Sequence, residues 1–409
     1  MRAGSRTRAL IVLTALACAT ASLVGVPASS AARPHVLYVS AKAKKKNKRC
    51  TKKAPCRTIA RAIRIAHPGN EILVLRGTYR EQVNVAKRVT LVGSGKPTID
   101  ATGHVNGVLI AGPSAAKAVV RGFVVQNASE EGILDRGVGF VTISGNTVRA
   151  NDKGLSVVPP AGQCAPQGPV PGDCGEGLHL MGASNVTVEG NTVTANAGGI
   201  LLTDEIGPTA HNTVAKNTVI GNVLDCGITL AGHNPKAVTL AATPGPPTVA
   251  GVAPTVGGIY DNVIENNTVN GNGVKGLGAG IGLFGGAPGT AVYNNSVLDN
   301  TAEGNGLGGV TLHSHAPGQD LSGNTISGNI LSGDGIAGYP NGAPGDEDVG
   351  LKETAGIILF SAATKLTSTT VEHNQISNEQ IGIWTQNAPL IPRTANTFAS
   401  TVKTGLVQK

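Results

Sequence analysis

The stretch SNVTVEGNTVTANAGGILLTDE, residues 184–205, sets the pattern that most of the chain repeats. It reads as V-x-V-x-x-N-x-V-x-x-N-x-x-G-I-x-L. Two short segments of alternating apolar residues each end near an asparagine, and a third segment begins with glycine. Alternation with a period of two predicts β-strands with one buried face, and Asn and Gly predict the corners between them. Three short strands and their corners make one triangular coil.

The same pattern returns along the chain, at residues 141–152, 212–222, 262–272, 291–300, 320–329 and 369–378. One such coil cannot bury its apolar face alone, so it must stack on its neighbours. We therefore predict an all-β fold, a single-stranded parallel β-helix solenoid in which each coil contributes one strand to each wall.

Asparagine recurs at one place in this pattern. Asn191 returns as Asn146, Asn217, Asn267, Asn295, Asn324 and Asn374. Asn tolerates the left-handed backbone region, which suits a sharp corner. Stacked coils would bring these amides to about 4.8 Å from one another, close enough for a hydrogen-bonded ladder. The recurrence favours a ladder over ordinary loop asparagines or glycosylation acceptors.

The first 32 residues are typical of a secretory signal peptide. Arg2, Arg6 and Arg8 precede an apolar run that reaches about Val26, and small residues follow at positions 30–32. The run is too short and wrongly flanked to span a membrane, and we predict no membrane span elsewhere. We expect a secreted or cell-wall-associated protein, and a monomer.

Export to an oxidising compartment decides how the cysteines are interpreted. We predict two local disulfides, Cys50–Cys56 and Cys164–Cys174, and a buried free thiol at Cys226. The alternative of a metal held by these cysteines is weaker, because the chain has no Cys-x-x-Cys pair.

Positive charge is concentrated near the N-terminus. Residues 42–53 contain eight Lys or Arg and no acid, in a chain of net charge +8. We predict a basic N-terminal arm over residues 33–56, which either binds an acidic wall polymer or is a solvated flexible segment. Nucleic acid is not expected as a partner, because 3% aromatic residues offer few platforms for base stacking.

The segment APCRTIARAIRIAHPGNEILVLRGTYREQVNV, residues 54–85, opens the repeats. Thr58 can cap a short helix whose apolar residues share one face, and strands follow around Gly77-Thr78-Tyr79. With RVTLVGSGKPTIDA, this opening resembles the N-terminal cap and first coils of right-handed parallel β-helices of the pectin-lyase-like superfamily. The resemblance extends to about Phe398, so it implies a β-helix over residues 57–398 and a C-terminal tail over 399–409.

Function is less defined by this resemblance, because the superfamily includes polysaccharide lyases, glycoside hydrolases, epimerases and proteins without known activity. Thr203-Asp204-Glu205, Asp225-Cys226-Gly227 and Gly232-His233-Asn234 look only loosely like the acidic and Gly-His-Gly elements of polygalacturonase-like hydrolases. Pectate-lyase-like enzymes use an Arg or Lys base; this chain has no Arg between Arg149 and Arg393, although Lys216 and Lys275 lie in range. No catalytic set of the superfamily can be carried over whole.

Three insertions rich in Pro, Gly and Ala interrupt the coils, at residues 159–176, 234–256 and 339–355. Each lies beside the third strand of its coil, the one that reads G-[IVL]-x-[LIV]. Insertions on one side of a repeat protein usually mark its binding face, so we predict a groove along this strand.

Polar and aromatic residues are concentrated on the outward positions of that third strand. We predict catalytic roles for Asp204, Glu205, Asp225 and His233, and substrate-binding roles for His179, Thr203, Asn234, Phe284, His313 and His315, with Phe360 and Trp384 beyond. Carboxylates and imidazoles serve acid–base catalysis, or hold a divalent metal such as Ca²⁺ or a His-bound transition metal. The sequence therefore favours a secreted β-helix that binds and cleaves a polysaccharide. A non-catalytic carbohydrate-binding solenoid and a metal-handling protein are the alternatives.

Overall fold

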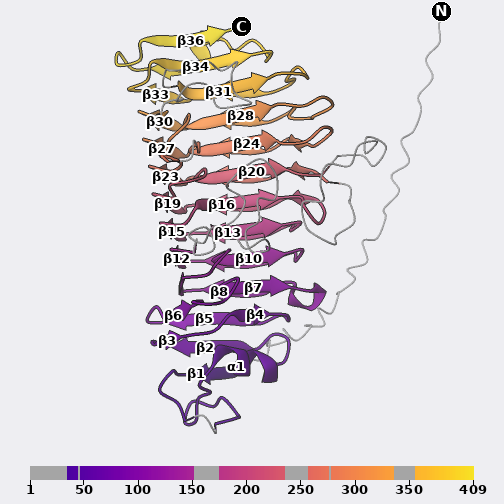
Figure 1. Cartoon of the computed structure of the whole chain (residues 1–409), viewed down its shortest axis with the longest axis vertical. Coiled ribbons are helices and arrows are strands. Elements are labelled where there is room, and N and C mark those ends of the chain that lie inside the picture. Colours follow the sequence, from indigo (N-terminus) through magenta and orange to yellow (C-terminus); the bar gives the residue numbers. More distant parts are fainter. Residues whose placement is uncertain (1–34, 45–46, 152–174, 235–256, 276–277, 336–354) are drawn as a thin grey trace, which may run out of the picture. The chain divides into compact units, whose positions relative to one another are not determined.

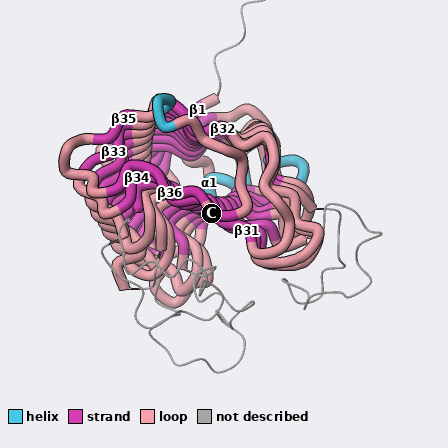
Figure 2. The backbone as a smooth tube through the Cα atoms, turned by 90° about the horizontal axis from the view of Figure 1, so that it is seen from above, coloured by secondary structure: helices cyan, strands magenta, loops and turns pink. Residues whose placement is uncertain are grey.

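The computed structural model describes residues 35–44, 47–151, 175–234, 257–275, 278–335 and 355–409. Residues 34–409 form one compact unit, in which coils of short strands stack one upon another (Figure 1). Three sheets of 11 strands run along this stack, and their strands pair in parallel. Viewed along the stack, the sheets form walls around an interior (Figure 2). The predicted all-β parallel β-helix is confirmed.

The first two walls consist mostly of three-residue strands. Sheet A contains β1 (Val36–Val39), β2 (Glu71–Leu75), β5 (Thr90–Ser94), β8 (Val119–Arg121), β11 (Thr142–Ser144), β14 (Thr187–Glu189), β18 (Thr213–Ala215), β22 (Val263–Glu265), β26 (Ser296–Leu298), β29 (Thr325–Ser327) and β32 (Thr370–Glu372). Sheet B contains β3 (Thr78–Tyr79), β6 (Thr98–Asp100), β9 (Val124–Gln126), β12 (Thr147–Arg149), β15 (Thr192–Thr194), β19 (Thr218–Ile220), β23 (Thr268–Asn270), β27 (Thr301–Glu303), β30 (Ile330–Ser332), β33 (Gln375–Ser377) and β35 (Thr397–Phe398).

The third wall has longer strands. Sheet C contains β4 (Val83–Val85), β7 (Val108–Ala111), β10 (Ile133–Arg136), β13 (Glu176–Met181), β16 (Gly198–Thr203), β20 (Ile228–Gly232), β24 (Ile281–Gly285), β28 (Val310–Ser314), β31 (Ala355–Ser361), β34 (Ile381–Gln386) and β36 (Thr404–Gln408). A small sheet D joins β17 (Thr209–Ala210), β21 (Ile259–Tyr260) and β25 (Val292–Tyr293). Among the described residues, short 3₁₀-helices lie at Pro113–Ala115 and Arg393–Ala395.

Aliphatic rows fill the interior of the stack. In sheets A and B the middle residue of each three-residue strand is buried, as the alternating pattern predicts. Register aligns these residues from coil to coil, so that Ile143 lies beside Val188 and Val188 beside Val214. Burial of such rows supplies the driving force that one coil lacks on its own.

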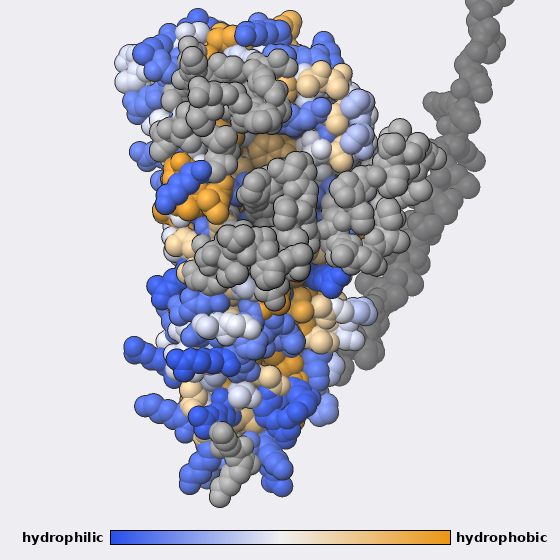
Figure 3. Space-filling view, in the orientation of Figure 1, coloured by the Kyte–Doolittle hydropathy of each residue, from blue (hydrophilic) through white to orange (hydrophobic). Residues whose placement is uncertain are grey.

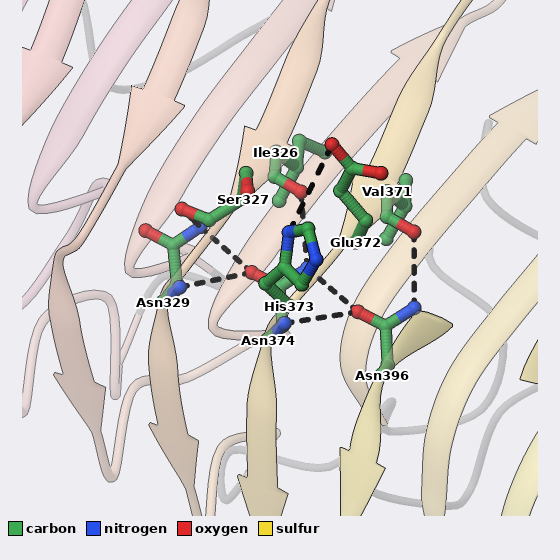
Figure 4. Close-up of polar contacts among 8 residues, drawn as sticks. All are labelled: Ile326, Ser327, Asn329, Val371, Glu372, His373, Asn374 and Asn396. Atoms are coloured by element: carbon green, nitrogen blue, oxygen red, sulfur yellow. Dashed lines mark hydrogen bonds and ion pairs between the residues drawn. The ribbon is translucent and has the colours of Figure 1, made fainter. Parts of the chain in front are cut away.

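Asparagine ladders line the corners. Asn217 accepts hydrogen bonds from the backbone N–H and side-chain amide of Asn191, and donates to Asn267 Oδ1 and to the carbonyl of Val188. Figure 4 shows the C-terminal part of this ladder, where Asn329 donates to Asn374 and Asn374 to Asn396. The predicted ladder is confirmed, and its members are Asn146, Asn191, Asn217, Asn267, Asn300, Asn329, Asn374 and Asn396.

Two features of the predicted ladder are wrong. Asn295 and Asn324 belong to a second ladder, which begins with Asn212 and Asn262 and lies at the corner before sheet A. A third ladder follows sheet B and consists of Asn151, Asn196, Asn222, Asn272, Asn305 and Asp334. The left-handed conformation is adopted by the residue before each asparagine of the first ladder up to Asn374, with φ from 53° to 71°. The ladder asparagine is held by its hydrogen bonds instead.

A short helix and a disulfide-closed loop lie at the N-terminal end. Helix α1 (Ile59–Ile65) begins after Thr58, whose hydroxyl accepts the N–H of Arg61 at 3.2 Å, as predicted. The carboxylate of Glu81 accepts the N–H groups of Ile59 and Ala60, both at 2.9 Å. Ile59, Ala62 and Ile63 are buried, so α1 covers the apolar end of the first coils.

The β-helix extends beyond the predicted limits at both ends. Strand β1 lies within the predicted basic arm and pairs with β2, and β36 lies within the predicted tail and pairs with β34. The predicted Cys50–Cys56 disulfide is confirmed, with an S–S distance of 1.99 Å, and Cys226 is a buried free thiol. The signal peptide and Cys164–Cys174 lie outside the described residues. Within the described part, no helix is long and apolar enough to cross a membrane.

Candidate functional site

Sheet C differs from the other walls because both of its faces are buried over most of the stack. From β13 onwards its strands up to β34 have five to seven residues, and β16 and β31 are buried along their whole length. One set of side chains, such as Leu178 and Ile200, fills the interior. The alternate set lies on the outward side, which we call the outer face of sheet C.

A group of polar side chains meets at β13 on this outer face. His179 Nε2 lies 2.9 Å from the hydroxyl of Thr203, and His179 Nδ1 lies 3.4 Å from Oε1 of Glu131. The other oxygen of Glu131 accepts the backbone N–H of Glu176 at 3.0 Å. These four residues, Glu131, Glu176, His179 and Thr203, form what we call the carboxylate–imidazole cluster, and each is at most 5% exposed.

The register of the sheet explains this meeting. Ile133 pairs with Leu178, so the glutamates two residues before them, Glu131 and Glu176, occupy equivalent places on neighbouring coils. Glu176 in turn pairs with Gly198, and a Cβ at Gly198 would come within 2.1 Å of Glu176 Oε2. Glycine on the next coil therefore leaves the space that the Glu176 carboxylate occupies.

Glu131 and Glu176 were not among the predicted site residues. A signal for them exists, because each is followed by glycine and then by the first inward residue of a sheet C strand, as Glu131-Gly132-Ile133 and Glu176-Gly177-Leu178. Only two coils carry this Glu-Gly pattern before sheet C. His179 and Thr203 were predicted as substrate-binding residues, and the structure brings them into direct contact.

Asp204 is fully buried, and the prediction that it lies on a solvent-facing strip is wrong. Its Oδ1 accepts the backbone N–H groups of His233 at 2.6 Å and Asn234 at 3.1 Å, and its Oδ2 accepts that of Gly258 at 2.6 Å. Asn234 returns a bond to the carbonyl of Asp204 at 2.7 Å. Burial raises the pKa of Asp204, while the three N–H donors and the neighbouring His233 lower it. The carboxylate therefore joins chain segments that are far apart in the sequence.

The two remaining predicted acids differ in burial. Glu205 is buried, and Asp225 is half-buried beside Cys226. Burial, followed by the negative charge of Asp225, raises the pKa of the Cys226 thiol well above its ordinary value. Cys226 packs with Ala279 and Leu307 in a small cluster separate from the main core.

Aromatic and imidazole rings form a second group further along sheet C. Phe284, His313 and Phe360 occupy equivalent positions on β24, β28 and β31. The His313 ring lies 5.5 Å from that of Phe284 and 5.9 Å from that of Phe360, and the His315 ring is 5.6 Å from Phe360. Trp384 on β34 stacks on Phe360 at 6.3 Å. We call these five residues the aromatic strip.

The structure thus gathers all of the predicted site residues except Glu205 and Asp225 into three groups. His179 and Thr203 belong to the carboxylate–imidazole cluster, and Phe284, His313 and His315 belong to the aromatic strip. Asp204, His233 and Asn234 form the buried connection described above. The predicted insertions that would wall the groove lie largely outside the described residues. Among the residues that are described, no group of three or more His, Cys, Asp or Glu side chains has the arrangement of a metal site.

Comparison with protein families gives one match. Residues 89–241 match the family model described as "Right handed beta helix region". This match and the three parallel sheets agree with the resemblance to right-handed parallel β-helices. A comparison with curated protein sequences gives no significant match.

Several solved structures share the fold. The alginate lyase from Paenibacillus sp. str. FPU-7 matches with a TM-score of 0.51 and 12% identity, over 81% of this chain and 96% of that one. The Dettilon tailspike protein matches with a TM-score of 0.51 and 16% identity, over 91% and 68% of the two chains. The GH136 lacto-N-biosidase from Eubacterium ramulus matches with a TM-score of 0.50 and 13% identity, over 91% and 68%. At these identities the likeness is one of fold.

Proposed function

We propose that this protein is a secreted, monomeric β-helix that binds an extracellular polysaccharide along the outer face of sheet C and cleaves it. The observation that carries the proposal is the carboxylate–imidazole cluster, in which the Glu131 carboxylate contacts both His179 and the backbone of Glu176, the equivalent glutamate on the next coil. Such a grouping of titratable side chains on one face is the usual starting point for acid–base chemistry.

The cluster has the groups that glycoside hydrolysis requires. Most glycoside hydrolases use two carboxyl groups, one as acid and one as base or nucleophile. Glu131 and Glu176 would supply this pair. His179 would move a proton between its partners, because one of its ring nitrogens faces Glu131 and the other faces the hydroxyl of Thr203.

A lyase would use the same cluster differently. In β-elimination a base removes a proton from the sugar ring and an acid protonates the departing oxygen, and a neutral imidazole can serve as that base. The alginate lyase with the same fold supports polysaccharides as the class of substrate. Hydrolysis and elimination leave different products, so the chemistry of the products decides between them.

The aromatic strip would hold the polymer beside the cluster. From β13 to β24 is three strand spacings, or roughly 14 Å at the usual strand separation. An extended polymer lying across the strands would meet both groups. Aromatic rings offer apolar faces for sugar rings, and imidazoles offer hydrogen bonds for hydroxyl groups.

A second candidate function is polysaccharide binding without cleavage. The burial of the cluster favours it, because side chains at most 5% exposed have little surface to offer a substrate. In that case Glu131, Glu176 and His179 would only fix the register of neighbouring coils, and the outer face would bind through its half-buried residues such as Phe284 and His315.

A polysaccharide panel tests the proposal. Neutral and acidic polysaccharides are incubated with the protein, and products are followed by new reducing ends and by the ultraviolet absorbance of unsaturated sugars. Reducing ends without absorbance indicate hydrolysis, and both together indicate elimination. Binding without any product would support the second candidate and contradict the first.

Substitution then locates the site. Glu176→Gln should lower turnover by about a hundredfold or more, the usual scale for losing an acid–base group. Glu265→Gln is the matched control, because Glu265 is a half-buried residue on sheet A. Equal losses in the two variants would show that the carboxylate–imidazole cluster does not carry the reaction.

A further inference from the structure

The N-terminal end of the stack has the strongest local excess of positive charge in the chain. Residues 42–70 contain eleven of its 33 Lys and Arg residues, whereas all 25 Asp and Glu residues lie elsewhere. Hydrophilic side chains cover this end of the molecule, at the bottom of the view in Figure 3. The charge is therefore local to the cap that α1 and the Cys50–Cys56 loop build over the first coils.

Part of this charge surrounds a hollow. A pocket of about 400 Å³ opens beside α1. Its lining consists of Asn47, Thr58 and four basic side chains, those of Lys48, Arg57, Arg61 and Arg64. Lys48, Arg57 and Arg64 are exposed, and Arg61 is half-buried. We call this hollow the cap pocket.

The pocket is held in shape by the chain around it. Arg61 donates from Nη2 to the carbonyl of Lys48 at 3.1 Å, which ties the helix to the preceding loop. Asn47 donates to the carbonyl of Pro55 at 3.1 Å, and the Cys50–Cys56 disulfide closes the overlapping loop of residues 50–56. The basic side chains therefore project from a braced frame, although they belong to two separate segments.

These charges have no protein counter-charge in the described part of the chain. None of the ion pairs between described residues involves a side chain of the cap pocket. The nearby carboxylate of Glu81 accepts the first two N–H groups of α1 instead. Like charges held together without ion pairs raise the free energy of the cap, and an anionic ligand would lower it.

We propose that the cap pocket binds the carboxylate groups of an acidic polysaccharide, and so anchors the protein to an acidic matrix away from the outer face of sheet C. Guanidinium groups match planar carboxylates with paired hydrogen bonds, and three of the four cations are arginines. No aromatic side chain lines the pocket, which disfavours a single-stranded nucleic acid. The anchoring is independent of whether the cluster at β13 cleaves a substrate.

Binding to polygalacturonate tests the proposal. The probe is compared with its methyl-esterified form, which keeps the backbone and loses the charge. The variant is Arg57→Gln with Arg64→Gln, because it keeps the bond from Arg61 to Lys48 and hence the frame. The control is Arg121→Gln with Arg149→Gln, two exposed arginines on sheets A and B.

The cap variant should raise the dissociation constant for polygalacturonate at low salt about tenfold or more, and the control less than twofold. Salt should weaken binding by the intact protein much more steeply than binding by the cap variant. Equal losses in the two variants, or equal affinity for the methyl-esterified polymer, would overturn the proposal. So would tighter binding of single-stranded DNA than of polygalacturonate. Cleavage of a soluble substrate should be unchanged in the cap variant, which separates this proposal from the catalytic one.

Discussion

Sheets A and C are built by the same coils, yet their outward sides have little in common. On sheet A the outward residues of β11, β14 and β22 are half-exposed threonine, serine, valine and glutamate. On sheet C the outward residues of β16, β28 and β31 are buried and include threonine, histidine and phenylalanine. The interior rows of the two sheets are mostly aliphatic, with Asp135 of sheet C as an exception. The repeat therefore requires apolar residues on the inward side, while the outward side of sheet C can differ in composition from that of sheet A.

The largest expected effect sharpens this contrast through activity. His179→Ala should lower turnover on the substrate found by the polysaccharide panel by about a hundredfold or more, because it removes the group between Glu131 and Thr203. The control is His211→Ala, whose imidazole is about half exposed and pairs with Asp261 at 3.7 Å. Turnover is measured at saturating substrate. A similar loss in both variants would erase the distinction between sheet C and the rest of the stack.

The next effect concerns the corners. Asn217→Ala removes a side chain with four hydrogen bonds and should lower the free energy of unfolding by about 1–3 kcal/mol. Asn374→Ala should cost as much, since the Asn374 side chain makes the same four kinds of hydrogen bond. Asn396→Ala should cost less, because Asn396 ends the ladder. Urea unfolding measures all three. Thr187→Ala on sheet A should change the free energy of unfolding by no more than about 0.5 kcal/mol. A larger loss at Thr187 than at Asn217 would contradict the ladder's role.

A smaller loss is expected at Asp204. Asp204→Asn replaces one acceptor oxygen by an amide group that faces backbone N–H donors, so we expect a loss of about 1–2 kcal/mol in unfolding free energy. Asp261→Asn, at an exposed site, is the control. Unchanged stability together with lost turnover would return Asp204 to the catalytic group, against its buried geometry.

The last expected effect is a pH dependence from the interior. Asp135 occupies an inward position between Ile110 and Leu180, and burial raises its pKa from 3.8 to about 7. The folded protein therefore binds this proton more tightly than the unfolded chain, so stability falls as pH rises from about 4 to 7 and then levels. Asp135→Asn should make the melting temperature fall less steeply over this pH range than it does in the unmodified protein. An unchanged pH profile would show that Asp135 is ionised at little cost.

The fold could be predicted from the sequence because its signals are local. Alternation around Val188 and Val193 marks each strand, and the recurrence of asparagine marks each corner. The ends were less predictable, because β1 and β36 lack the asparagine pattern and are recognised only through their pairing.

The candidate site could be predicted only in part. Sequence alternation places His179 and Thr203 on the outward side, but it does not show that this side is buried. Glu131 and Glu176 meet across 45 residues, and the donors to Asp204 lie up to 54 residues away. Insertions of unequal length separate these partners, so their spacing in the sequence does not predict which residues lie side by side on neighbouring coils.

The spacing of the ladders has a consequence for how the chain finds its phase. Asn262, Asn267 and Asn272 lie five residues apart and enter three different ladders, and the next coil repeats the spacing with Asn295, Asn300 and Asn305. A coil wound one corner out of phase would still present an asparagine at each corner. The five-residue strands of sheet C break this ambiguity, because they cannot occupy a wall of three-residue strands. The wall that carries the candidate site thus also fixes the phase of each new coil.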